Sequence, residues 1–87
     1  MSEFTLKRKQ ADTIKVTIDD RSFQIPLGNS ITPKDWAEIN TFAGTVSFFS
    51  RYIPEEVADT LVVDDWNAIT DAWKAATSEA TGKTAGE

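Results

Sequence analysis

The chain has 87 residues, with fourteen Asp and Glu against nine Lys and Arg, and a formal net charge of −5. It contains no Cys and no His, which excludes disulfides, thiolate nucleophiles, the usual zinc sites and a Ser-His-Asp triad. A chain of this size supports one modest core, burying about 60–65% of the surface that the unfolded chain exposes. We therefore expect one cytoplasmic, non-enzymatic domain over residues 1–80, without a cofactor or metal. Its alternating and helical patterns predict the α+β class, and the small, polar residues 81–87 predict a flexible tail.

The charge is unevenly distributed along the chain. Residues 1–34 hold six basic and four acidic side chains, whereas residues 35–87 hold three basic and ten acidic ones. Most of the surface would repel a phosphate backbone, and the cluster Lys7-Arg8-Lys9 is too small to reverse this, so we expect no nucleic-acid partner. The apolar runs are also far shorter than the roughly 20 residues that a membrane-spanning helix needs.

The first predicted element is a β-hairpin over 14–27, where apolar and polar residues alternate. With Asp20-Arg21 as the turn, one register pairs all the apolar residues: Ile18 with Phe23, Val16 with Ile25, and Ile14 with Leu27. Phe4 and Leu6 alternate in the same way, which allows a short third strand.

Helical segments are predicted after the hairpin. Thr32 is placed as an N-cap before Pro33, and the helix should continue to about Arg51, because Pro54 forces a boundary. Gly44 lies inside this helix at a cost of about 1 kcal/mol relative to Ala, which points to a bend or a close contact there.

A short helical turn is predicted to begin at Pro54. Asp64 then caps a final helix that ends near 77–80. This helix carries an apolar stripe, which we expect to face the core, formed by Trp66, Ile69, Trp73 and Ala76. The predicted architecture is thus an antiparallel hairpin, with or without a third strand, packed against two main C-terminal helices.

The helix predicted over 33–51 and the residues just after it have one wide apolar face. At 100° per residue, a core-facing arc of about 140° holds Trp36, Ile39, Phe42, Ala43, Val46, Phe49 and Ile53. Phe48 and Tyr52 fall outside this arc. Either the helix ends early and both pack under the segment at Pro54, or they form an exposed apolar patch for a protein partner. In the second case the acidic side chains that follow, Glu55, Glu56 and Asp59, would border the patch.

Two kinds of motif could suggest nucleotide binding or acid–base catalysis, but neither predicts that function strongly. Gly82-Lys83-Thr84 matches the end of a phosphate-binding loop, but position 77 is Thr where the pattern needs Gly. The acidic pairs Asp19-Asp20, Glu55-Glu56 and Asp64-Asp65 lie at a predicted turn or helix start, where local effects favour acids. We therefore expect neither nucleotide binding nor acid–base catalysis.

Several segments together resemble the small tail assembly chaperones of long-tailed bacteriophages. They are Phe4-Thr5-Leu6-Lys7-Arg8-Lys9, the hairpin, Asp64-Asp65-Trp66-Asn67-Ala68-Ile69, Asp71-Ala72-Trp73-Lys74-Ala75-Ala76, and the ending Ser78-Glu79-Ala80-Thr81-Gly82-Lys83-Thr84-Ala85-Gly86-Glu87. The resemblance implies a protein that binds the apolar, helix-rich tape-measure protein, contacts tail-tube subunits, acts in the host cytoplasm and is absent from the finished virion. It also implies a longer product made by frameshifting.

Two other functions fit the same residues. A structural tail or head-completion protein would use the hairpin edge for strand addition and remain in the virion. An acidic protein-binding inhibitor would use the negative charge of residues 35–87 and bind a basic partner in a salt-sensitive way.

Overall fold

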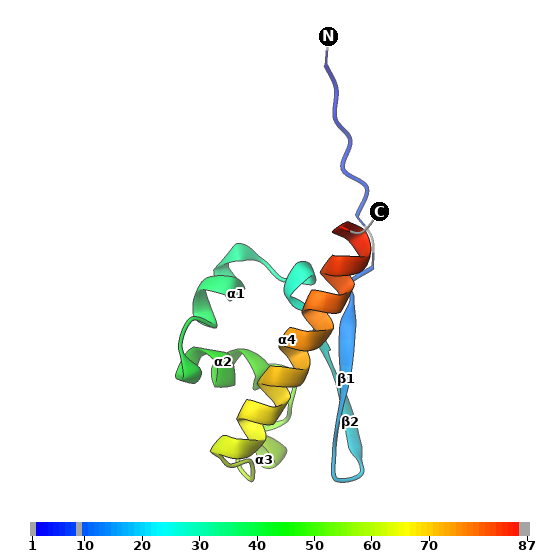
Figure 1. Ribbon diagram of the computed structural model, residues 1–87. Coiled ribbons are helices and arrows are strands. Elements are labelled where there is room, and N and C mark those ends of the chain that lie inside the picture. The colour runs from blue at the N-terminus through cyan, green and yellow to red at the C-terminus, as the bar shows by residue number, and fades with distance from the viewer. Residues whose placement is uncertain (1, 9, 86–87) are drawn as a thin grey trace.

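The computed structural model describes residues 2–8 and 10–85, with only the backbone described for 82–85. The elements, in chain order, are strands β1 (Thr13–Ile18) and β2 (Arg21–Pro26), the 3-10 turn η1 (Gly28–Ser30), and helices α1 (Pro33–Glu38), α2 (Phe42–Phe49), α3 (Glu55–Ala58) and α4 (Val63–Ala85). Helix α4 runs through the middle, with the hairpin on one side and α1 and α2 on the other (Figure 1). This arrangement confirms the predicted α+β class.

The hairpin forms where the alternation predicted it, but its register differs from the prediction by two residues. The observed pairs include Ile14 with Ile25, Val16 with Phe23, and Ile18 with Arg21. The turn is Asp19-Asp20, and Asp19 takes a left-handed φ of 53°, which Asp tolerates better than most residues. A shift of two residues leaves every side chain on its predicted face, so the apolar face is unchanged.

The short third strand that Phe4 and Leu6 allowed is not formed in the described part of the chain. Residues 2–8 have no regular secondary structure, and the two side chains are 83% and 69% exposed. Just before β1, Asp12 accepts a hydrogen bond from the Leu27 backbone N–H at 2.8 Å and donates its own to Ser30 Oγ at 2.9 Å. The chain is therefore held against η1, and the preceding residues extend away from the sheet (Figure 1).

The prediction of a single helix over 33–51 is wrong, because the structure has two helices there, α1 and α2, which meet at a corner over residues 39–41. Thr32 caps α1 as predicted, but α1 ends at Glu38, and Thr41 caps α2 by accepting the Gly44 N–H at 3.0 Å. A Cβ added to Gly44 would lie 1.8 Å from the Glu38 carbonyl oxygen. The close contact expected at Gly44 is confirmed, and it is the place where the two helices pack backbone against backbone.

The last two helices also differ in detail from the prediction. Pro54 is the N-cap of α3 rather than its first residue. Helix α4 begins at Val63, so Asp64 lies inside its first turn and is not the predicted N-cap. Asp65 Oδ2 accepts the Val62 N–H at 3.0 Å. Helix α4 continues to Ala85, beyond the predicted end at 77–80. The tail predicted over 81–87 thus begins as helix, and its last two residues lie outside the described part.

The core is centred on Trp73 of α4. Its ring lies 5.9 Å from that of Trp36, 6.1 Å from Phe48 and 5.8 Å from Phe49. Its indole Nε1 donates to the Pro26 carbonyl oxygen at 2.8 Å, which ties α4 to the end of β2. The predicted stripe is confirmed: two of its members are buried and two are partly buried against the core, namely Trp66 and Trp73, then Ile69 and Ala76.

Candidate protein-binding surface

Phe48, predicted to lie on an exposed flank, is fully buried. It has 0% exposure, and its ring packs 5.5 Å from Phe49 and 5.5 Å from Tyr52. The predicted arc assumed one uninterrupted helix. The corner at 39–41 changes the direction of the chain, so residues of α1 and α2 no longer share one face. Phe48 therefore offers no surface to a partner, and its assignment to a binding patch is wrong.

The other predicted site residues lie nearer the surface. Tyr52 is partly buried in the turn after α2, and Glu55, Glu56 and Asp59 are exposed on α3 and its C-cap. Glu56 Oε1 accepts a hydrogen bond from Arg21 Nη1 at 2.8 Å, which joins α3 to the start of β2. For Phe48 the observed packing matches the alternative in which the helix ends early, since α2 ends at Phe49.

Two aromatic rings of the helical part, Trp36 and Phe42, are instead exposed, although both were predicted to be core. Trp36 is 45% exposed and Phe42 is 48% exposed. Trp36 is nevertheless held in place: its Nε1 donates to the Gly28 carbonyl oxygen at 2.7 Å. A Cβ on Gly28 would lie 2.6 Å from the Trp36 ring, so this glycine permits the close approach. The result is a fixed, half-exposed indole.

Trp36 forms one wall of a groove between α1 and α4, which we call the α1–α4 groove. Its volume is about 450 Å³, and its lining residues are Trp36, Ile39, Asn40, Trp73, Lys74, Thr77 and Ser78. The Thr77 hydroxyl accepts the Gly28 N–H at 3.0 Å, so η1 is attached to both walls. The groove thus combines apolar rings with one cation, Lys74, among its lining residues.

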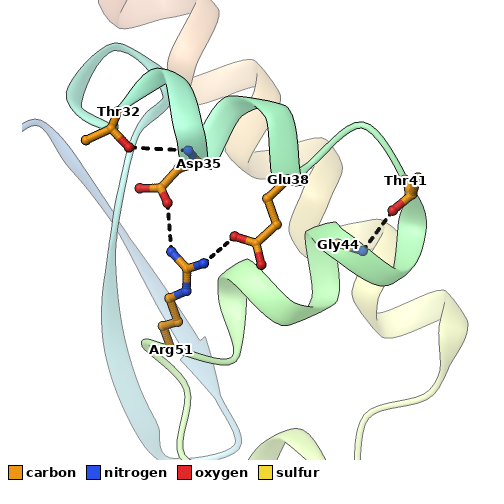
Figure 2. Close-up of polar contacts among 6 residues, drawn as sticks. All are labelled: Thr32, Asp35, Glu38, Thr41, Gly44 and Arg51. Carbon is orange, nitrogen blue, oxygen red and sulfur yellow. Dashed lines mark hydrogen bonds and ion pairs between the residues drawn. The ribbon is translucent and has the colours of Figure 1, made fainter.

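A polar cluster sets the position of α1 against the end of α2 (Figure 2). Arg51 donates from Nη1 to Asp35 Oδ1 at 2.8 Å and from Nη2 to Glu38 Oε1. The hydrogen bond from Arg51 lowers the pKa of Asp35, and the same bond raises the pKa of Arg51. Because Trp36 follows Asp35 directly, this cluster also supports the wall of the α1–α4 groove.

Thr41 is the residue from which the sequence could have predicted that Trp36 and Phe42 are exposed. A Thr followed by the apolar run Phe42-Ala43 is a possible helix start, and a start at this point separates α1 from α2. The continuous apolar periodicity from residue 36 to 53 masked this signal.

Among residues 2–8 and 10–85, no three His, Cys, Asp or Glu side chains gather in a way that could hold a metal ion. No helix in the same part of the chain is long and apolar enough to cross a membrane. No model of a known protein family, no curated protein and no solved structure matches this chain.

Proposed function

We propose that this chain is a non-enzymatic, cytoplasmic tail assembly chaperone of a long-tailed bacteriophage, which binds the tape-measure protein and keeps it soluble. The segments from Phe4 to Lys9 and from Asp64 to Ala76 support the family. The half-exposed Trp36 of the α1–α4 groove is the observation that carries the binding role. An aromatic ring held by its own hydrogen bond loses little conformational freedom on binding, which favours a role as an anchor.

The groove suits one side of an amphipathic helix. Such a partner places side chains at i, i+3, i+4 and i+7 along one apolar face. Trp36 and Ile39 would contact that face, and exposed Phe42 at the start of α2 would extend it. Lys74 would contact an acidic side chain at the edge of the partner helix.

Co-purification with the tape-measure protein of the same phage tests this proposal. Ser78→Arg places a long cation in the groove without removing a buried contact, and Phe42→Ser removes exposed apolar surface. Each should weaken binding by about tenfold or more, while circular dichroism shows an unchanged fold. Val62→Ser is the matched control, because Val62 is 62% exposed but lies outside the groove. Unchanged binding by both Ser78→Arg and Phe42→Ser would contradict the proposal.

A structural role in the virion is the second candidate. Within the described residues the sheet has two strands, so each strand has an outer edge without a strand partner, and an edge of this kind can accept another chain. Mass analysis of purified virions separates the two functions: a chaperone should be absent, whereas a structural protein should be present in a fixed ratio to the tube subunit.

A further inference from the structure

The molecule has an acidic end. The hairpin turn, α3 and the start of α4 lie together at the end opposite the N-terminus (Figure 1). Acidic side chains occur in each of these three elements or directly beside them, namely Asp19, Asp20, Glu55, Glu56, Asp59, Asp64 and Asp65. One cation at this end, Arg21, is already paired with Glu56. This end therefore has a strongly negative potential.

A pocket opens at this acidic end, between the hairpin turn and α4. We call it the tip pocket; its volume is about 490 Å³, and it is lined by Thr17, Ile18, Asp19, Thr60, Leu61, Asp65, Ala68 and Ile69. The lining thus joins aliphatic side chains to two carboxylates and contains no basic residue. It is complementary to a ligand that carries an apolar side chain beside a cation.

The N-terminal arm, residues 2–8, has this composition. Phe4 and Leu6 are the most exposed large apolar side chains in the described residues, at 83% and 69%. In an extended chain, residues two apart lie on the same side, so Phe4 and Leu6 can enter one apolar site together. Lys7 and Arg8 follow at once, where they would meet the carboxylates of the tip pocket.

The arm of the same chain points away from its own tip pocket. Asp12, at the base of the arm, is hydrogen-bonded to Leu27 and Ser30 at the end of the hairpin opposite the turn. Figure 1 shows the arm continuing away from the domain on that side. A second copy is the partner that brings a basic apolar arm to an acidic apolar pocket.

We propose that the N-terminal arm of one copy inserts Phe4 and Leu6 into the tip pocket of a second copy, so that the chain associates head to tail. Lys7 and Arg8 pair with the acidic rim of that pocket. The contact joins two different surfaces, so each added copy leaves one arm and one pocket free. Such an interface continues into a filament unless the rotation between copies closes it into a ring.

Sedimentation of the full chain over a range of concentrations is the first test. At about 0.1 M salt, where the Debye length is about 10 Å, association should increase with concentration. At about 1 M salt, where this length is about 3 Å, the dissociation constant should rise about tenfold or more. A chain that stays monomeric at low salt at every concentration overturns the proposal.

Two variants separate the two sides of the contact. Phe4→Ser with Leu6→Ser disables the arm at two exposed side chains. Ala68→Arg fills the tip pocket from an exposed position on α4 and adds a charge that repels the arm. Circular dichroism and the tryptophan fluorescence of the chain, to which buried Trp66 and Trp73 contribute, check that Ala68→Arg is folded. Each variant alone should be monomeric, and an equal mixture should form a dimer with one copy of each.

The mixture is decisive because it requires one intact arm and one intact pocket on different chains. Association of either variant alone at wild-type strength, or a mixture that stays monomeric, overturns the proposal. The variants Phe42→Ser and Ser78→Arg, which test tape-measure binding, should self-associate like wild type, so the two proposals can fail independently.

Discussion

Arg51 Nη1 lies 2.8 Å from Asp35 Oδ1, and this contact joins the turn after α2 to the first turn of α1. The guanidinium also lies over the Phe48 ring, 5.7 Å from its centroid. One side chain thus spans both helices of the corner and covers a core aromatic ring. The orientation of α1, and with it the position of Trp36, depends on this residue.

Arg51→Gln should change how stability depends on pH. The Arg51 hydrogen bond lowers the pKa of Asp35 below its ordinary value of 3.8 in the folded state. The stabilisation from this carboxylate is therefore fully present above 3.8 and is lost as the pH falls through the lowered folded pKa. The stability difference between wild type and Arg51→Gln should be largest near neutral pH and shrink in acid.

Urea unfolding at a series of pH values measures this difference. Arg21→Gln is the control, because it removes an exposed ion pair with Glu56 and leaves Asp35 in contact with Arg51. A stability difference for Arg51→Gln that stays constant into acid would show that Asp35 is not the group responsible.

Gly44→Ala tests the corner between α1 and α2, because the corner decides whether this change lowers or raises the free energy of unfolding. In an ordinary helix this change stabilises by about 1 kcal/mol. Here the new Cβ would lie 1.8 Å from the Glu38 carbonyl oxygen, so we expect destabilisation of about 1–3 kcal/mol, as for an overpacked site. Chemical denaturation measures it, with Ser47→Ala on exposed α2 surface as the control. A more stable Gly44→Ala variant would mean that the corner is absent.

Thr41→Ala should lower the free energy of unfolding by about 1 kcal/mol, because it removes the N-cap of α2. The Thr41 hydroxyl accepts the Gly44 N–H at 3.0 Å. Thr41→Ser keeps the hydroxyl and should stay within about 0.5 kcal/mol of wild type. If residues 33–51 were one continuous helix, Ala would instead be the better residue at this position, and the variant would gain stability.

Phe48→Ala should lower the free energy of unfolding by about 3–5 kcal/mol, the usual cost of removing a buried aromatic ring. Phe42→Ala removes the same group from a site that is 48% exposed, so its cost should be about 1 kcal/mol. Thermal unfolding of both variants compares the two positions. Small and equal losses of unfolding free energy in the two variants would place Phe48 at the surface, contrary to the structure.

Local patterns predicted the elements that depend on neighbouring residues. The alternation from Ile14 to Leu27 predicted the hairpin, and Thr32 before Pro33 predicted the start of α1. The spacing of Trp66 and Trp73 predicted the buried stripe of α4. Each of these signals involves residues close together in sequence, and backbone geometry converts such spacing directly into a face or a cap.

The candidate site could not be predicted in the same way. The apolar periodicity predicted that Trp36 and Phe42 are buried and placed Phe48 outside the buried face. In the structure Trp36 and Phe42 are exposed and Phe48 is buried. The cause is the corner between α1 and α2, which depends on the contact between Gly44 and the Glu38 carbonyl.

The sequence by itself determined the α+β class, the apolar face of the hairpin and the inward side of α4, since these follow from the periods of strand and helix. Only the tertiary structure decided the hairpin register, the helix corner and which aromatic rings reach the surface. The physical reason is competition: more apolar side chains were available than one small core can enclose. Phe48 and Phe49, which pack against Trp73 from a distant part of the chain, are enclosed for this reason rather than by local spacing.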